Sequence, residues 1–208
     1  MTNNLNPVLH ALRIAAAASA LLAATAIHAQ TITGVDGSGA PGGIATVGFD
    51  FDFGSGVSIA AFDSMLSWSP AQLTLVGSSV SYHGSVVDVA TVLSASGQFS
   101  PFDDSANGMI TATWFALDGS FNPLPPLDLD GQGHVSLTFA LAAALPAGTQ
   151  SDVVLDFTPS YDLTGAGPDP IQATAVVTAV PEPQTWALLL AGGAGLGALM
   201  RRRERKHA

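Results

Sequence analysis

Residues 45–53 alternate strictly between apolar and small or polar side chains, a pattern that a helix cannot bury on one face. The apolar positions are Ala45, Val47, Phe49, Phe51 and Phe53. The positions between them are Thr46, Gly48, Asp50 and Asp52. Successive side chains of a β-strand point to opposite faces, so this segment predicts a strand with one dry and one wet face.

The same pattern recurs along the middle of the chain. Phe62, Leu66 and Trp68 fit a second strand, and further strands are expected over 109–117, 134–141, 153–157 and 173–179. Clusters of turn-forming residues lie at 34–43, 94–108, 122–133 and 165–170. No stretch of the middle has a convincing helical period. Short strands separated by turns predict an all-β fold, a single antiparallel β-sandwich over residues 30–180.

Charge is distributed very unevenly along the 208 residues. No Lys or Arg occurs between Ala29 and Met200, whereas the same stretch holds fourteen Asp and a single Glu, Glu182. Nucleic-acid binding needs clustered Lys and Arg, so it is excluded as a function. Cysteine is absent, which excludes a disulfide framework, thiolate chemistry and cysteine-based zinc sites.

The first 29 residues have the pattern of a secretory signal peptide. Arg13 precedes a run of Ala, Leu and Ile over 14–27, and Ala29 ends a small-residue cleavage site. The run is short for a hydrocarbon core of ~30 Å, which favours a cleaved signal over a first transmembrane helix. Cleavage after Ala29 makes Gln30 the new N-terminus, and cleavage after Ala26 is the alternative.

An apolar, uncharged segment lies near the end of the chain and is followed by a basic tail. Residues 186–200 carry no charge, and Arg201, Arg202 and Arg203 follow directly. Basic residues beside an apolar helix stay in the cytoplasm, so the pattern predicts a transmembrane helix with these arginines as its cytoplasmic stop. A helix of this length reaches only about 22 Å, which suits a temporary inner-membrane anchor.

Pro181, Glu182 and Pro183 stand directly before that segment, and two prolines hold the backbone extended. The Pro-Glu-Pro sequence, the Gly-rich apolar helix and the arginine cluster, in this order, closely resemble the PEP-CTERM sorting signal over 181–208. The resemblance implies a bacterium with an outer membrane and an exopolysaccharide matrix. It also implies processing near the motif by an exosortase, a membrane-embedded cysteine protease, so that the motif is a substrate for another enzyme.

The middle of the chain carries a second resemblance. Residues 40–43 lead into the alternating strand, Trp68-Ser69-Pro70 precedes the Leu73-Thr74-Leu75-Val76 segment, and residues 146–149 precede the last strand. This order is similar to the cohesin and carbohydrate-binding-module-like sandwich, which has Tyr-Asp-Pro where this chain has Trp-Ser-Pro. The resemblance implies a jelly roll of about nine strands over 39–179, a domain that binds partners and does not catalyse.

Three carboxylate pairs could support hydrolysis, because glycosidases use paired carboxylates. They are Asp50/Asp52, Asp103/Asp104 and Asp128/Asp130. Residues two apart on a strand share a face, so a solvated polar face is the favoured interpretation. A Ser–His–Asp triad is a further alternative, and within residues 30–180 its base could come only from His83 or His134. We assign no catalytic residue, and a secreted hydrolase that uses an Asp pair is the rival hypothesis.

Residues 128–133, Asp-Leu-Asp-Gly-Gln-Gly, are similar to part of a calcium loop, with oxygen ligands on alternate residues. An Asp-Gly turn between strands is the favoured interpretation, and no cofactor or metal ligand is assigned. Diffuse Ca²⁺ binding to the acidic surface, as in a calcium-dependent adhesin, stays open.

Exposed aromatic rings could stack on sugars. The candidates are Trp68, Trp114, Tyr82 and Tyr161. Packing in or near the core is favoured for each, and Tyr161, in a loop, is expected to be the most exposed.

These patterns predict an exported, non-catalytic protein that is anchored briefly and then released to the cell surface or extracellular matrix. Its expected role is adhesive or structural, or carbohydrate-associated. The expected partners are the processing protease and either an extracellular polysaccharide or another surface protein.

Overall fold

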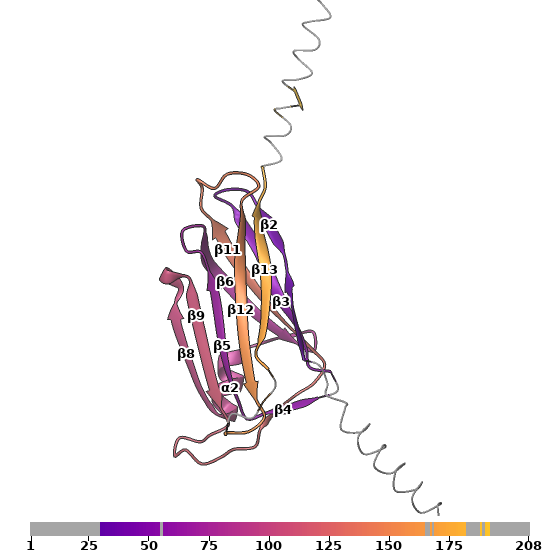
Figure 1. Cartoon of the computed structure of the whole chain (residues 1–208), viewed down its shortest axis with the longest axis vertical. Helices are drawn as coiled ribbons and strands as arrows, with labels where there is room; N and C mark the ends of the chain where they lie inside the picture. The colour runs from indigo at the N-terminus through magenta and orange to yellow at the C-terminus, as the bar shows by residue number, and fades with distance from the viewer. Residues whose placement is uncertain are drawn as a thin grey trace, which may run out of the picture.

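The computed structural model describes residues 30–54, 56–164, 167, 169–181, 188, 190 and 191. Those up to the end of the last strand, at Ala179, form an elongated β-sandwich (Figure 1). Its strands are β1 (Thr31–Val35), β2 (Gly37–Gly39), β3 (Ile44–Asp52), β4 (Val57–Ile59), β5 (Ala61–Trp68), β6 (Leu73–Tyr82), β7 (Ser85–Val87), β8 (Gln98–Asp104), β9 (Met109–Phe115), β10 (Leu127–Leu129), β11 (Gln132–Leu141), β12 (Gln150–Ser160) and β13 (Ile171–Ala179). The helices are α2 (Val89–Ser96) and the short 3-10 turn η1 (Ser105–Asn107).

Two large sheets make the sandwich. One has five strands in the order β1-β3-β11-β6-β7, and the other has six in the order β2-β13-β12-β5-β9-β8. A small third sheet pairs β4 with β10. Nine of the strands have five or more residues, in agreement with the jelly roll of about nine strands that the sequence predicts.

The alternating segments supply the core, as predicted. Ala45, Val47 and Phe49 of β3 are buried between the sheets, while Asp50 and Asp52 are exposed on the outer face. Across the sandwich, the rings of Trp68 and Phe139 meet edge to face at 5.4 Å between centroids. Burying these side chains supplies the main favourable term in folding.

A second, smaller core lies beneath α2. It contains Ile59, Ala60, Leu93, Trp114 and Ala116. Asp88 caps the helix, because its side chain accepts hydrogen bonds from the backbone N–H and the hydroxyl of Thr91. Leu93, the buried residue of the helix, anchors it on this core.

The structure corrects several expectations for the connecting segments. The stretch 94–108, expected to be turns, contains the end of α2, all of β8 and η1, and the stretch 34–43 contains part of β1 and all of β2. The stretch 122–133 contains β10 and the start of β11. Apart from β11, these strands lie at sheet edges or are very short, and β8 carries Pro101. Their pairing partners, rather than their own hydrophobic period, therefore define them.

The sandwich is not purely antiparallel, which is a further correction. β2 pairs with β13 in parallel, with Val177 opposite Gly37. β1 and β2 form one continuous segment that leaves the five-stranded sheet and joins the six-stranded sheet at Asp36. At this crossing, the Asp36 carboxylate accepts a hydrogen bond of 2.8 Å from the backbone N–H of Val176.

The expected terminal helices fall almost entirely outside this description; of residues 186–200, only 188, 190 and 191 are described, and they are helical. Residues 1–29, Glu182, Pro183 and the three arginines 201–203 are not among the described residues. Within the described part of the chain, no helix has the length and apolar character needed to cross a membrane.

Glycines let the crossing segment pass close to both sheets. A Cβ at Gly34 would collide with the carbonyl oxygen of Thr174, and a Cβ at Gly37 would collide with that of Thr46. Both obstacles are backbone atoms in paired strands, so neither can move aside cheaply. The segment therefore closes one side of the sandwich only because it lacks these side chains.

We expect Gly37→Ala to lower the free energy of unfolding by about 2 kcal/mol, because the methyl group must push two strands apart. Gly119→Ala is the matched control, since nothing lies within 4 Å of the added Cβ there. Urea unfolding of the two variants measures the difference. Equal stability would show that the close approach at Gly37 carries no energetic weight.

Candidate functional site

The strand register shows which strand termini lie together at each end of the sandwich. β13 ends at Ala179 at one end. At the other, which we call the distal end, Ala61 at the start of β5 pairs with both Phe115 and Ser160. Figure 1 shows α2 and β4 at this distal end, away from the end where β13 finishes. Loops that follow β6, β9 and β10 gather there.

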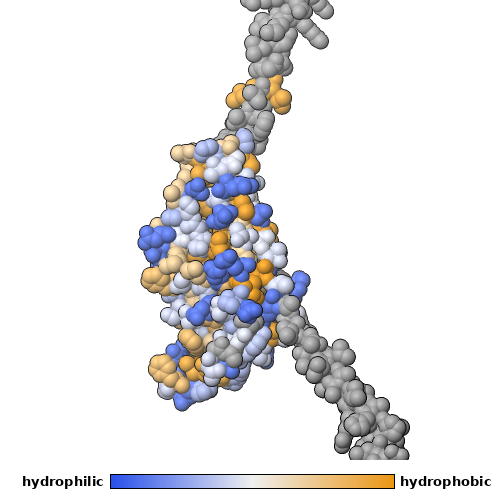
Figure 2. Space-filling model, in the orientation of Figure 1, coloured by the Kyte–Doolittle hydropathy of each residue, from blue (hydrophilic) through white to orange (hydrophobic). Residues whose placement is uncertain are grey.

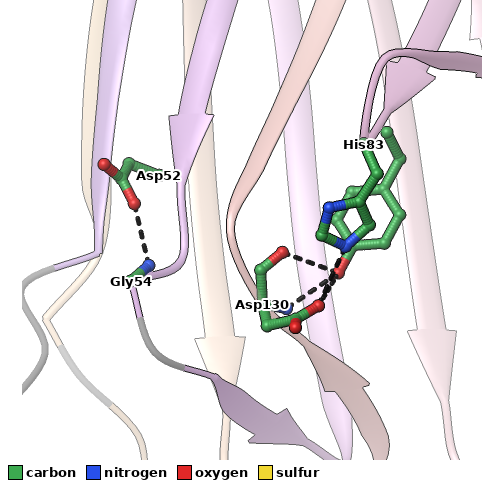
Figure 3. Close-up of polar contacts among 5 residues, drawn as sticks. Asp52, Gly54, His83 and Asp130 are labelled. Atoms are coloured by element: carbon green, nitrogen blue, oxygen red, sulfur yellow. Dashed lines mark hydrogen bonds and ion pairs between the residues drawn. The ribbon is translucent and has the colours of Figure 1, made fainter.

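Three loops meet at the distal end, where the N–H of Gly131 donates to the carbonyl of Gly54 at 3.0 Å and the N–H of His83 donates to that of Gln132 at 3.2 Å. We call this group the Asp130 cluster. It consists of Asp52, Gly54, Tyr82, His83 and Asp130 (Figure 3). His83 and Gly84 form a two-residue hairpin turn with φ values of 49° and 74°, as a type I′ turn requires. This turn aims the rings of Tyr82 and His83 at the next loop.

Asp130 receives the contacts of both rings. Its backbone N–H donates to the Tyr82 hydroxyl oxygen at 2.7 Å, and that hydroxyl lies 2.9 Å from the Asp130 carboxylate. His83 Nε2 is 2.9 Å from the same carboxylate oxygen. Gly131, with φ of 63°, packs against the His83 ring and completes the turn. The predicted Asp-Gly turn is therefore confirmed, and the loop is held by a tyrosine and a histidine.

The electrostatics of the cluster favour a fixed carboxylate rather than an acid catalyst. Hydrogen bonds from Tyr82 and then His83 lower the pKa of Asp130. Burial, followed by contact with Asp130, raises the pKa of Tyr82. At neutral pH the carboxylate is thus ionised and the phenol neutral. A general acid needs the opposite, a carboxyl group whose pKa is raised.

Asp50 and Asp52 have separate partners. Asp50 lies 2.6 Å from His134 Nδ1, and the His134 ring rests on the backbone of Gly48. Asp52 accepts a hydrogen bond of 2.8 Å from the backbone N–H of Gly54. Both carboxylates border a shallow depression of about 350 Å³ on the outer face of β1, β3 and β11. Open to solvent and lined by threonines and Gln132, it lacks a nucleophile–base pair.

In the other predicted carboxylate pairs, too, each carboxylate has its own hydrogen-bond partner. Asp103 accepts from the backbone N–H of Ser105 at 2.9 Å, and Asp104 from the Asn107 amide at 2.8 Å. Asp128 accepts from the Ser58 hydroxyl across the β4–β10 pair, whereas Asp130 belongs to the cluster described above. Over the described ranges, no three His, Asp or Glu side chains come together as a metal site would need.

Three of the four candidate aromatic residues are committed to the protein interior or to protein contacts. Trp68 and Trp114 are buried, and their indole N–H groups donate to the carbonyls of Leu73 at 3.2 Å and Leu93 at 3.0 Å. Tyr82 belongs to the Asp130 cluster. Tyr161 is exposed, as expected.

Sequence reasoning missed the most conspicuous exposed ring. Phe121 is 73% exposed and adopts a left-handed φ of 63°, a conformation rare for a bulky residue. Asp118 holds this loop, because its carboxylate accepts 2.8 Å hydrogen bonds from the backbone N–H groups of Ser120 and Asn122. The available signal was an aromatic residue inside the turn-forming run Asp-Gly-Ser-Phe-Asn-Pro. We call residues 118–122 the Phe121 loop.

Phe121, with its left-handed backbone conformation, lies at the distal end, beyond β9. The N–H of Phe121 donates to the carbonyl of Asp118 at 2.9 Å, and the N–H of Asp118 donates to the carbonyl of Asn122 at the same distance. Such a closed loop displays its aromatic side chain in one backbone conformation. An exposed ring gains little from burial.

Comparisons with known proteins support both resemblances seen in the sequence. The PEP-CTERM protein-sorting motif matches residues 179–206. A cohesin from Acetivibrio cellulolyticus, ScaC in complex with the ScaB dockerin, is similar at 12% identity with a TM-score of 0.50, over 72% of this chain and 99% of the cohesin. No curated protein matches the chain.

Two further similar structures come from other organisms. A non-cellulosomal cohesin from Archaeoglobus fulgidus is 13% identical over 76% of this chain and 96% of its own, with a TM-score of 0.44. The major pilin subunit BcpA of Bacillus cereus is 11% identical over 72% of this chain and 40% of its own, with a TM-score of 0.47. The chain thus carries a PEP-CTERM sorting motif and has structural neighbours among cohesin β-sandwich domains.

We expect Asp130→Asn to lower the thermal midpoint near pH 6 and to have a smaller effect near pH 3, since the ordinary pKa of Asp is about 3.9. A lowered folded-state pKa stabilises the protein above the ordinary pKa, and this stabilisation disappears as pH falls through the folded-state value. Asp152→Asn, at an exposed carboxylate of β12, is the control. Thermal melts across this pH range test the expectation, which a pH-independent effect of Asp130→Asn would refute.

We expect Phe121→Gly to be more stable than Phe121→Ala by about 1 kcal/mol, because only alanine keeps a Cβ in the left-handed conformation. Both variants lack the ring, so the comparison isolates backbone strain. Urea unfolding measures the difference. If the two variants unfold at the same concentration, the loop is not strained at residue 121.

Proposed function

We propose that this chain is an exported, non-catalytic protein of the cell surface or extracellular matrix, with a structural or adhesive role. One observation carries the proposal: the sorting motif begins at residue 179, where the last strand of the sandwich ends. The folded domain and the sorting signal are therefore consecutive and share almost no residues.

The junction between the two parts is compatible with cleavage. Ala179 is buried, and its N–H and carbonyl bond to Thr149 at 2.8 Å and Gly148 at 2.7 Å. The N–H of Val180 donates to the carbonyl of Gly39 at 2.9 Å. Processing within Pro181, Glu182 and Pro183 would leave all these hydrogen bonds in place.

The remaining steps of the route follow from the sequence. Cleavage between Ala29 and Gln30 would release the N-terminus, and Arg201, Arg202 and Arg203 would hold the tail in the cytoplasm until an exosortase-type protease acts. The inner-membrane anchor would then be transient. The free product would consist of residues 30 to about 183.

We propose that the distal end and the outer face of the six-stranded sheet make the contacts with partners. Phe102, 58% exposed on β8, lies in one register row with Thr111 and Met65, and the Phe121 loop extends beyond β9. Figure 2 shows hydrophobic and hydrophilic residues interspersed over one face of the molecule. Exposed rings of this kind are typical anchors in protein interfaces.

The similar cohesin from Acetivibrio cellulolyticus is in complex with a dockerin, and we propose that this chain also uses its sandwich to hold another surface protein or a polysaccharide. Asp63 and Asp156 lie on the same outer face as Met65. Since residues 30–180 contain no Lys or Arg, a partner with cationic groups around an apolar surface would suit this face best.

A secreted hydrolase is the second candidate, and the geometry favours it less. Hydrogen bonds lower the pKa values of Asp88, Asp103, Asp118 and Asp130, the main donors being Thr91, Ser105, Asn122 and Tyr82 in turn. An active site that uses paired carboxylates needs one of them to be protonated at working pH. The carboxylates here suit hydrogen-bond acceptance instead.

We expect the mature protein, purified from its native host, to begin near Gln30, to end within residues 181–183 and to lie outside the cell. Intact-mass measurement and cell fractionation provide the test. In a host strain that lacks the processing protease, the tail should remain and the protein should stay in the inner membrane. An intact tail and membrane location in the unmodified host would refute the proposed function.

A further inference from the structure

Gln30, the residue directly before β1, has an unusual environment. Its side-chain Nε2 and Oε1 are both shielded from solvent and have no hydrogen-bond partner. Leaving a buried polar group unpaired is costly, so folded proteins rarely do so without a reason. Among the residues that the structure describes, Gln30 is the only one with such side-chain atoms.

The same residue stands at the predicted processing site. Cleavage after Ala29 gives Gln30 a free α-amino group, a few bonds away from its own side-chain amide. Because residues 30–180 contain no Lys or Arg, this group would be the sole primary amine of that segment. An α-amino group has a pKa of about 7.7–8.0, so a substantial fraction is the uncharged, nucleophilic amine near neutral pH.

We propose that the mature chain begins with pyroglutamate formed from Gln30, an inference that rests on the signal cleavage of the proposed function. The α-amino nitrogen attacks the side-chain carbonyl carbon Cδ and forms a new C–N bond. The bond from Cδ to Nε2 breaks, and Nε2 leaves as ammonia with one hydrogen from the amine. The product is a five-membered lactam, and the step needs no oxidant, reductant or further reactant.

The structure gives two reasons for this outcome. Ring closure removes the amide NH₂ group, whose two donors have no partner at this position. It also replaces an ammonium group with a neutral lactam, which loses less when it leaves water. Nucleophile and carbonyl belong to one residue, so the reaction has the advantage of an intramolecular step.

The modification would leave the sheet unchanged. The first paired residue of β1 is Thr31, which lies opposite Asp52. A ring at residue 30 therefore sits just before the ladder and alters none of its registered pairs. It would also remove the free amine that aminopeptidases require at the start of a strand.

Mass spectrometry of the N-terminal peptide of the mature protein, purified from the native host, tests the proposal. We expect a peptide that begins at residue 30 and is lighter than the linear Gln30 peptide by one ammonia. Digestion with a pyroglutamate-specific aminopeptidase should then expose Thr31 to stepwise sequencing. Gln30→Asn is the control, because its amide would have to close a strained four-membered ring, so the variant should stay linear.

The outcomes separate the modification from the export route. A linear Gln30 at the N-terminus of an exported protein would overturn the pyroglutamate proposal and leave the proposed function standing. A chain that begins at residue 27, or that retains residues 1–29, would overturn the pyroglutamate proposal, because Gln30 would then not be the N-terminal residue. If Gln30→Asn is not exported, the aminopeptidase result on the natural chain, which keeps Gln30, still decides whether pyroglutamate is present.

Discussion

The crossing of the β1–β2 segment from one sheet to the other is the constraint on which the rest of the structure depends. The Asp36 carboxylate holds Val176 at this point, and glycines on either side allow the backbone to pass between β3 and β13. Because of this crossing, Thr31 lies opposite the end of β3, while Gly39 bonds to Val180 after β13. One short segment thus fixes both junctions at which processing is proposed.

Hydrogen bonds from backbone N–H groups to carboxylates take the place of ion pairs in this domain. With no Lys or Arg in residues 30–180, carboxylates such as Asp36, Asp88 and Asp118 accept from backbone N–H groups at a crossing, a helix start and a turn. Within the described ranges, the close contacts between a carboxylate and a basic side chain are those of Asp130 with His83 and of Asp50 with His134. Surface ion pairs contribute little in most proteins, so their scarcity costs little stability. Uncompensated negative charge instead favours solubility and repels anionic polymers.

Sequence patterns predicted what repeats regularly and missed what depends on distant partners. The alternation in β3, β11 and β13 records which side chains face the core, so these strands were predictable. α2 is too short to show a period, and its stability comes from the Asp88 cap and from Leu93 packing near Trp114. The Asp130 cluster joins residues 48 positions apart, and no local pattern records that contact. The exposure of Phe121 depends on the Asp118 turn, which holds the ring outside the core.

The edge strand β8 has a consequence for how copies of this protein coexist. Open sheet edges can recruit a strand from a neighbouring molecule and so start fibril growth. β8 borders the six-stranded sheet and carries Pro101, which has no N–H to donate, followed by the charged pair Asp103 and Asp104. Both features disfavour the addition of another strand. The β8 edge is therefore a poor template for a strand from a second copy, so copies held close together would not join through it.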